Sequence, residues 1–402
     1  MTSTTQAQVQ AGHEPLWTAP FILLSLSNFF VFLGFQMLLP TVPLFVSEHG
    51  GSSTQVGLVI GLLTLSAVLI RPIAGAFLDK WGRKLILAIG IAICLLAMGG
   101  YLIAATVFLM LMIRFIHGIG WGIATTTFGV IASDIVPASR RGEGMGYFGL
   151  GSTLAMAVGP FAGLWLLKQY GFTFLFAATL LSTLFALIGM QFIKLRSRIE
   201  EAPKREAASF WSRIVDKSAL FPSLLALLLG GTYGGLVSFI TLFGNEAGIE
   251  NIGWFFLFNA ASIFVVRPIS GKLFDRKGHI WVLFPGALFC IAGLILTSYA
   301  SSTWTLVAAA ILYGIGFGSI QPSIQAWVIS RSAPNRRGAA NATFYSAFDI
   351  GIGGGGMLLG LVAQGSSYAQ MYRYSSLILV AYLVLYFFYI AARKEASTSN
   401  AS

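Results

Sequence analysis

Three ionisable residues lie inside long apolar segments, where a charge is costly. Asp349 is the one carboxylate that we place deep in such a segment, and Arg114 and His117 lie one helical turn apart in another. Such groups hold protons or bind polar substrates, and an imidazole titrates near neutral pH. The alternatives are a fixed ion pair or a helix-end hydrogen bond for Asp349, and a simple hydrogen-bonding role for His117. We interpret Asp349 as a proton or substrate site and Arg114 as a functional charge.

Two further arginines, Arg71 and Arg267, each lie eight residues before an acid at the end of an apolar segment. At about 1.5 Å per residue, that is about 12 Å inside the segment. Each side chain could extend back to the charged end or face an internal cavity. Asn28 and Gln36, in the first apolar segment, could line a polar path or bond neighbouring helices. The sequence leaves these alternatives open.

Residues for several other kinds of chemistry are missing. No glycine-rich loop ends in Gly-Lys-Ser or Gly-Lys-Thr, so the chain is not an ATP-driven pump by itself. No Cys/His cluster predicts a metal site, and no nucleophile stands at a useful spacing from a base. Cys94 and Cys290 lie in apolar segments, where packing explains them better than a disulfide. We expect neither an enzyme nor a metal or cofactor.

The elements that carry these residues are predicted to be membrane-spanning helices. The chain is 56% hydrophobic and 10% charged, against roughly 25% charged in a soluble domain. Apolar segments long enough to cross a bilayer as helices recur along it, and they are continuously apolar, unlike the strands of a β-barrel. We predict twelve spans, at about 18–46, 54–78, 85–106, 108–133, 143–167, 173–194, 219–243, 252–274, 280–300, 303–330, 339–364 and 372–392.

The net charge of +11 comes from basic residues on one side of these spans. Of the 25 Lys and Arg residues, 20 fall on the side of the N-terminus, and only Lys168 and Arg373 fall on the other. By the positive-inside rule, both termini are cytoplasmic in a cell membrane, and the charge does not indicate nucleic acid. The predicted order is a tail at 1–16, a six-helix bundle at 17–194, a linker at 195–218, a second six-helix bundle at 219–392 and a tail at 393–402.

The two bundles are predicted to be copies of one unit. The stretch Arg71-Pro72-Ile73 recurs as Arg267-Pro268-Ile269, displaced by 196 residues. Other pairs at this offset are Gly75 and Gly271, Asp79 and Asp275, Gly82 and Gly278, Gly118 and Gly314, and Cys94 and Cys290. Several matches at one offset are hard to obtain by chance, so we expect two pseudo-symmetric halves.

In each half, the loop that follows the Arg-Pro-Ile stretch resembles the first sequence motif of the major facilitator superfamily of transporters. The residues that carry the resemblance are Gly75, Asp79, Gly82 and Arg83 in the first half and Gly271, Asp275 and Gly278 in the second. The resemblance implies a latch that holds the halves together on the cytoplasmic side, joined by an acid at the end of the fourth helix, here Asp134. Its counterpart is Ser330, so we expect a weaker second latch. The alternative is a basic turn without further role.

A second resemblance links Arg114 to proton transfer. Arg114-x-x-His117-Gly118 is similar to the superfamily's motif Arg-x-x-Gln-Gly, with His117 in place of Gln. The second half has Ala310 at the matching position, so the charge belongs to one half only. That asymmetry argues against a purely structural role for Arg114.

A third stretch resembles a motif found mainly in exporters of the superfamily. It consists of Gly146, Gly159, Pro160 and Gly163, while Ala155 and Leu164 depart from two of its glycines. Physically, two glycines four residues apart allow close helix contact, and the proline adds a kink. The motif therefore favours export over import.

Together these resemblances imply a twelve-helix, two-bundle transporter that works by alternating access, with its substrate site near the midplane between the bundles. We expect a monomer that exports a small amphipathic molecule in exchange for protons, resembling the drug:proton antiporters, with Arg114, Asp349 and His117 as coupling residues. One alternative is a solute:proton importer for a sugar, organic acid or peptide. Another is a flippase for lipids or lipid-linked sugars, which would need a cavity open sideways to the bilayer.

Overall fold

The computed structural model describes residues 15–137, 141–193, 216–332 and 337–399, and within these ranges it contains helices and no strand. The helices are α2 (Ala19–Glu48), α3 (Ser53–Trp81), α4 (Arg83–Tyr101), α5 (Val107–Ile135), α6 (Arg141–Gln191), the 3-10 turn η3 (Lys217–Ala219), α8 (Leu220–Glu246), α9 (Gly253–Lys277), α10 (Ile280–Ser298), α11 (Thr303–Arg331), α12 (Arg337–Gly365) and α13 (Tyr368–Ser399).

Eleven of the described helices are long and apolar enough to cross a membrane. The twelve predicted spans become eleven helices because α6 contains two of them. Its 51 residues would be about 76 Å long if straight, more than twice a bilayer's hydrocarbon core. The helix breaks at Gly171, whose φ of 79° lies in the left-handed region that glycine tolerates. The predicted all-α membrane fold is confirmed, and the expected loop between 167 and 173 shrinks to this one break.

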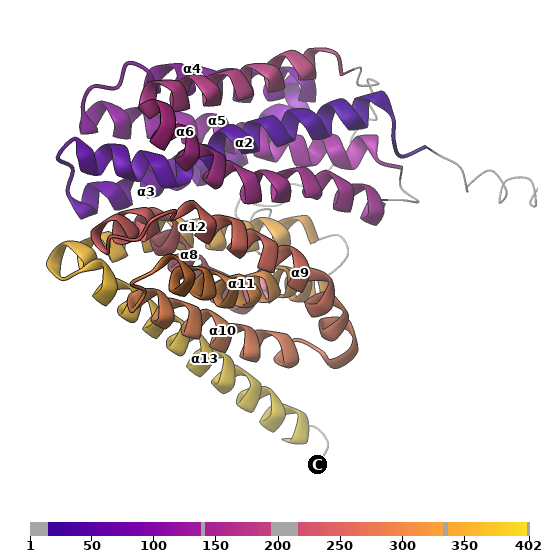
Figure 1. The fold of residues 1–402 in the computed structure, drawn as a ribbon. Helices are drawn as coiled ribbons and strands as arrows, with labels where there is room; N and C mark the ends of the chain where they lie inside the picture. The colour runs from indigo at the N-terminus through magenta and orange to yellow at the C-terminus, as the bar shows by residue number, and fades with distance from the viewer. Residues whose placement is uncertain (1–14, 138–140, 194–215, 333–336, 400–402) are drawn as a thin grey trace, which may run out of the picture.

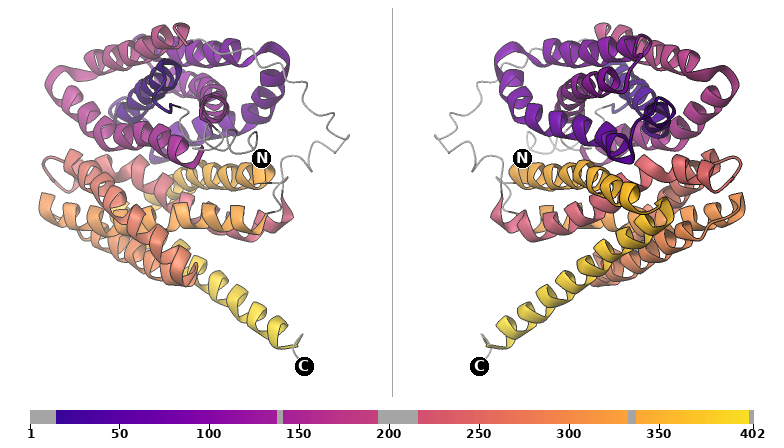
Figure 2. Two further views of the ribbon diagram at one scale, coloured as in Figure 1. Left: turned by 90° about the vertical axis from the view of Figure 1, so that its right-hand side faces the viewer. Right: turned by 90° about the vertical axis from the view of Figure 1, so that its left-hand side faces the viewer.

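The two halves lie side by side as separate bundles. Figure 1 shows α2 to α6, in indigo to magenta, along one side of the molecule and α8 to α13, ending in yellow, along the other. Two views turned by 90° keep the same division (Figure 2). The predicted N-terminal tail and interhalf linker lie almost entirely outside the described residues.

The last helix differs from its predicted end at 392. The apolar span ends at Ala391, but α13 continues to Ser399 and projects beyond the bundle (Figure 1). The added turns contain Lys394, Glu395 and Ala396, which are good helix formers. Hydropathy alone therefore located the end of the span and missed the end of the helix.

The 196-residue repeat recurs in the packing. A Cβ on Gly120 of α5 would stand 2.7 Å from the backbone nitrogen of Cys94 in α4, and a Cβ on Gly316 of α11 would stand 2.7 Å from that of Cys290 in α10. Only glycine permits these helix pairs to approach so closely. Both cysteines are free and buried, which agrees with the packing role predicted for them.

Glycines also bring the halves together. We call the end of the molecule with the turns at 49–52 and 299–302 the outer end, and the opposite end, predicted to be cytoplasmic, the inner end. Near the outer end, a Cβ on Gly57 of α3 would stand 2.3 Å from the Gly356 carbonyl oxygen of α12. About two turns farther out on α12, the Gln364 side chain is hydrogen-bonded to that of Thr54 on α3.

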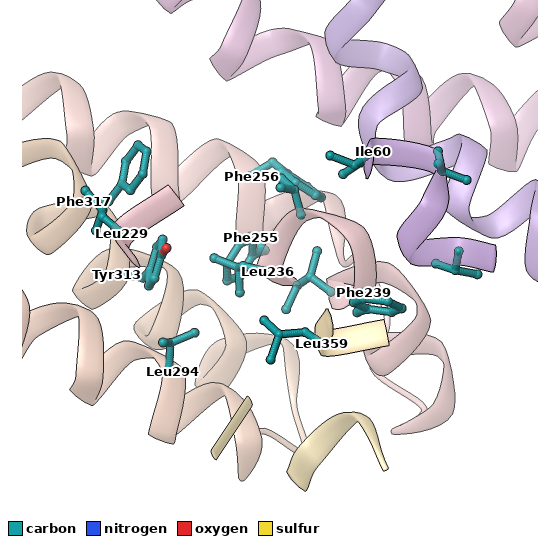
Figure 3. Close-up of a cluster of buried hydrophobic side chains, with 14 of the residues drawn as sticks. Ile60, Leu229, Leu236, Phe239, Phe255, Phe256, Leu294, Tyr313, Phe317 and Leu359 are labelled. Atoms are coloured by element: carbon teal, nitrogen blue, oxygen red, sulfur yellow. The ribbon is translucent and has the colours of Figure 1, made fainter. Parts of the chain in front are cut away.

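Apolar side chains extend this outer contact. Ile60 of α3 belongs to the same buried cluster as Phe239, Phe255 and Leu359 of the second half (Figure 3). Toward the inner end the surroundings change, because a Cβ on Gly75 or Gly271 would meet no described heavy atom within 4 Å. The described contacts therefore join α3 to α12 at the outer end, whereas a Cβ on either of these two inner-end glycines would meet open space.

Candidate functional site

An ion pair joins the halves at mid-depth. Arg71 of α3 donates a hydrogen bond from Nη1 to the Oδ2 atom of Asp349 on α12. Their side chains are 24% and 17% exposed, so water reaches the pair only in part. Protonation of the carboxylate would remove the charge that holds such an ion pair. Of the two interpretations of Arg71, the geometry favours the one inside the molecule.

The second half repeats this contact without the acid. Arg267 of α9, the counterpart of Arg71, donates from Nη1 to the Thr153 hydroxyl of α6 at 3.4 Å. Thr153 is the residue 196 positions before Asp349, so both contacts join matching places in the two halves. Sequence reasoning missed Thr153, although the offset that revealed the repeat also identifies it. One of the two matching contacts between the halves is thus an ion pair, Arg71 with Asp349. The other joins Arg267 to the hydroxyl of Thr153.

A cavity lies between the halves beside Arg267. It encloses about 30 Å³ that water-sized groups can occupy, within about 540 Å³ of space free of atoms that includes open solvent, so in this state it is a narrow cleft. Four helices from both halves contribute to it. Its lining residues are Gln36, Leu39, Thr153, Met156, Pro160, Tyr233, Leu236, Val237, Phe255, Phe256, Asn259, Ala260, Ile263 and Arg267.

This lining combines an apolar body with a few polar groups. Gln36 belongs to it, whereas Asn28 is buried elsewhere in α2, with 2% of its surface exposed. Asn259 donates from Nδ2 to the Ala310 carbonyl at 3.2 Å. The Nε atom of Arg267 is buried and has no hydrogen-bond partner among the described residues. Mostly apolar walls with a few convergent polar groups are typical of a small-molecule site.

Arg114 and His117 form a separate cluster inside the first half. Arg114 is 2% exposed, His117 is fully buried, and neither lines the cavity. The Tyr101 hydroxyl and His117 Nδ1 share a hydrogen bond of 3.0 Å, and the Arg114 guanidinium lies 5.5 Å from the Tyr101 ring centre. Sequence reasoning missed Tyr101, since no motif includes it.

The Arg114 cluster reaches the cavity through the backbone of α2. Arg114 Nη2 donates to the Leu38 carbonyl at 2.9 Å, and the neighbouring residue Leu39 lines the cavity. The structure therefore does not bring Arg114 and Asp349 together, and two helices link them: α2, through the Leu38 carbonyl, and α3, which packs on α5 and carries Arg71. The prolines Pro40 and Pro43, which follow within α2, each remove a backbone donor and so loosen that helix at this point.

The exporter-type residues pack against the same part of α2. A Cβ on Gly159 would stand 2.5 Å from the Gln36 Cβ atom, and one on Gly163 would stand 2.5 Å from the Met37 carbonyl oxygen. Pro160, between them, lines the cavity. The surroundings of Gly146 lie outside what the structure describes.

At the inner end, the first half has an ion pair with no counterpart among the described residues of the second half. Arg83 at the start of α4 pairs with Asp134 near the end of α5, and their side chains are 41% and 38% exposed. The Asp79 side chain lies outside the described ones. In the second half, His279 shares a hydrogen bond of 2.5 Å with the Tyr386 hydroxyl, while the Ser330 hydroxyl donates to the Trp327 carbonyl.

The turns that carry these inner-end residues have the same backbone in both halves. Gly82 and Gly278 have φ values of 86° and 83°, a left-handed conformation that strains any residue with a side chain. Asp275 is exposed and makes no ion pair with a residue that the structure describes. Both copies of the repeat therefore share the turn, whereas Arg83 and Asp134 of the described ion pair are replaced by His279 and Ser330 in the second copy.

A second, more open cavity lies at the outer end, between α2, α6, α8 and α9. It encloses about 1330 Å³, including space open to solvent, and Trp165 and Trp254 belong to its wall together with the charged residues Glu48, Lys168 and Glu250. Phe161 of α6 and Trp254 of α9 both belong to its wall, and their ring centres lie 6.1 Å apart.

Comparison with known proteins identifies relatives along nearly the whole chain. The sequence profile of the Major Facilitator Superfamily matches residues 24–355 and 251–402. The chain is 22% identical over 360 residues to an uncharacterized MFS-type transporter of Methanocaldococcus jannaschii, covering 88% of this chain and 93% of that protein. It is 26% identical over 355 residues to the multidrug resistance protein MdtG of Salmonella arizonae, covering 83% and 86% of the two chains.

A solved structure has the same fold. The bacterial homologue of the human lysosomal transporter Spinster, in an inward-facing and unoccupied conformation, superposes with a TM-score of 0.73 at 19% identity, covering 95% of this chain and 98% of that one. At this identity the likeness concerns the fold. It extends over both bundles and so includes every helix of the candidate site.

Proposed function

Because the chain belongs to the Major Facilitator Superfamily and is a multi-pass membrane transporter rather than an enzyme, we propose that it exports a small amphipathic molecule in exchange for protons. The observation that carries this proposal is the ion pair between Arg71 and Asp349. It is an ionisable contact between the two halves of the chain, on α3 and α12, whereas the cavity between the halves is lined by α2, α6, α8 and α9. Relatives named multidrug resistance proteins support the export direction.

In the proposed cycle, Asp349 carries the proton. A charged Asp349 binds Arg71 and stabilises the state that is closed at the outer end. Protonation removes the carboxylate charge, weakens the contact between α3 and α12, and so favours separation of the halves at that end. In that state the site takes its proton from the outer side, the protonated protein returns to the state closed at the outer end, and proton release toward the inner side then restores the pair. Since each state holds the proton differently, a proton gradient can drive the change of state in one direction.

Arg114 is proposed to support coupling from within the first half. Arg114→Ala removes a charged hydrogen bond to the Leu38 carbonyl, worth about 1.5–3 kcal/mol. We therefore expect proton-driven transport to fall at least about tenfold. Arg114→Lys has one ammonium and no planar fork, so we expect it to be impaired as well. Transport by the purified variants in vesicles, compared at equal protein content, checks this, and wild-type transport by Arg114→Ala would exclude Arg114 from the mechanism.

The inner-end motif is proposed to act as a latch that differs between the halves. The side chains of Arg83 and Asp134 are 41% and 38% exposed. Ion pairs exposed to this degree contribute up to about 1 kcal/mol to stability. We therefore expect Asp134→Asn to slow transport by roughly two- to fivefold. Asp275→Asn, which removes no described ion pair, should have a smaller effect.

Asp79→Asn extends the test of the latch to the loop itself. The resemblance of this loop to a superfamily motif predicts that Asp79→Asn is more damaging than Asp275→Asn in equally well-folded protein. If Asp275→Asn were the more damaging of the two, the asymmetric latch would be wrong.

The experiment that tests the proposed function uses vesicles with the purified protein and an imposed pH gradient. The probes are a panel of aromatic molecules that differ in charge. We expect at least one of them to move uphill when the side toward which it moves is acidic. This movement should stop when a protonophore removes the proton gradient. Uphill movement that needs no proton gradient, or movement of probe and protons in the same direction, would contradict proton-coupled export.

The proposal includes the orientation in the membrane. With both termini in the cytoplasm, the basic loops face inward, as the positive-inside rule requires. A cysteine placed in the outer turn at 49–52 should react with a membrane-impermeant thiol reagent in intact cells. This labelling checks the orientation.

A further inference from the structure

The cavity between the halves has one basic residue and no acidic residue among its described lining residues. The basic residue is Arg267. The ion pairs that the structure describes join other residues, Arg71 to Asp349 and Arg83 to Asp134. The cavity therefore carries a positive charge that no described carboxylate neutralises.

The repeat shows how this charge arises. Where Arg71 faces Asp349, Arg267 faces Thr153, the residue at the matching position of the other half. The hydroxyl accepts one hydrogen bond at 3.4 Å, a long contact for a guanidinium. The Nε atom of Arg267 is buried and unbonded among the described residues, and a buried donor of this kind costs free energy until an acceptor arrives.

From this geometry we infer that the cavity binds amphipathic organic anions, whose carboxylate, sulfonate or phosphate group takes the place beside Arg267 that a carboxylate occupies beside Arg71. Guanidinium groups bind such planar or tetrahedral oxyanions through two parallel hydrogen bonds. The apolar body of the anion would lie against Phe255, Phe256 and Ile263, which line the same cavity. This inference rests on the proposed transport function, and it assigns the substrate class of that function's site.

The charge asymmetry also separates two tasks between the halves. The contact between α3 and α12 includes the acid Asp349 and can respond to protons. The matching contact between α9 and α6 has the Thr153 hydroxyl in place of an acid and can respond to substrate. An anion bound to Arg267 would complete the second contact as Asp349 completes the first. Substrate binding would then strengthen one of the two matching contacts between the halves, and protonation would weaken the other.

The test measures binding to purified protein in detergent, without any gradient. The probes are naphthalenesulfonate and naphthylmethyl-trimethylammonium, which share a ring system and carry opposite charges that do not change with pH. We expect naphthalenesulfonate to bind at least about tenfold more tightly than the cation, since only the anion forms charge-assisted bonds with Arg267. Equal affinities, tighter binding of the cation, or no binding of naphthalenesulfonate would overturn the inference.

Variants assign the effect to Arg267. Arg267→Gln should weaken naphthalenesulfonate binding at least about tenfold, and Arg267→Lys should weaken it less because it keeps the charge. As a matched control, Arg373→Gln removes an arginine that packs on Tyr299 at the outer end, outside the cavity, and should leave binding unchanged. Undiminished naphthalenesulfonate binding by Arg267→Gln would overturn the inference.

Thr153→Asp provides a test by gain of charge. It introduces the carboxylate that the repeat has at 349, so it should pair with Arg267 and exclude naphthalenesulfonate as Arg267→Gln does. Asn has nearly the same size as Asp but no charge, so Thr153→Asn should bind the anion more tightly than Thr153→Asp. Equal binding by these two variants, both confirmed as folded by thermal unfolding, would count against the inference.

A failure of this inference can be distinguished experimentally from a failure of the proposed function. Binding of naphthalenesulfonate through Arg267 without pH-driven transport would contradict proton coupling and leave the substrate class standing. Conversely, pH-driven export of the cation, with no binding of naphthalenesulfonate, would support the export proposal and overturn the substrate class.

Discussion

Asp349→Asn abolishes proton-driven uphill transport while substrate exchange at equal pH survives: this is the largest effect that we expect from a single substitution. Asn has nearly the shape of Asp but cannot gain or lose a proton or form an ion pair with Arg71. It therefore resembles the permanently neutral form of Asp349. Uphill transport and exchange, measured in the same vesicles, check the two parts of this expectation.

Asp349→Glu is the matched comparison for this prediction. It keeps the ionisable group but displaces it by one methylene, so we expect partial uphill transport with a changed pH optimum. Unchanged uphill transport by Asp349→Asn would eliminate the proton role. Loss of exchange together with substrate binding would instead indicate a substrate or structural role for Asp349.

Gly57→Val should produce the second largest effect by preventing closure of the outer end. A Cβ at this position would stand 2.3 Å from the Gly356 carbonyl oxygen across the two halves, and backbone atoms cannot withdraw as a flexible side chain could. Overpacking of this kind costs about 1–3 kcal/mol. The cost applies only to the state closed at the outer end, so the population should shift away from it by about 5- to 150-fold.

Labelling of an engineered cysteine checks this shift. A cysteine at Thr54, which bonds Gln364 across the outer contact, should react faster with an impermeant thiol reagent when Gly57→Val is present. The background for this measurement lacks Cys94 and Cys290. Gly75→Val, on the same helix, is the matched control, because its added atoms meet no described neighbour within 4 Å in this state.

The two valine variants should behave differently in transport. Gly57→Val hinders a contact that the described state makes, so it should slow the cycle and raise outer labelling. Gly75→Val should not raise outer labelling. If Gly57→Val left both labelling and transport at the wild-type level, the outer contact would not be a gate.

The sequence by itself determined the architecture, since the features that define it are local. Segment length and hydropathy decide which stretches cross a bilayer, because the backbone can be satisfied there only within each helix. A repeat at a fixed offset reveals two copies of a unit without any knowledge of how they pack. The same local signals have limits, as α13 shows: its apolar span ends at Ala391 while its helix continues to Ser399.

For the site, the sequence identified ionisable residues in costly positions but not their partners. Arg71 and Asp349 were both candidates, yet 278 residues separate them along the chain, and no local pattern indicates that they meet. Arg114 and Asp349 were predicted to act together, yet the fold places Arg114 on the Leu38 carbonyl inside one half. Pairing across the molecule depends on how helices rotate and approach, which hydropathy does not specify.

Only the tertiary structure decided which arginine is neutralised. The sequence contains Arg71 and Arg267 as equal members of a repeat, and nothing near either one distinguishes them. Their difference lies on other helices, where Asp349 faces one and Thr153 faces the other. The physical reason is that a charge in an apolar segment is governed by what the opposing helix presents to it, and that helix belongs to the other half of the chain.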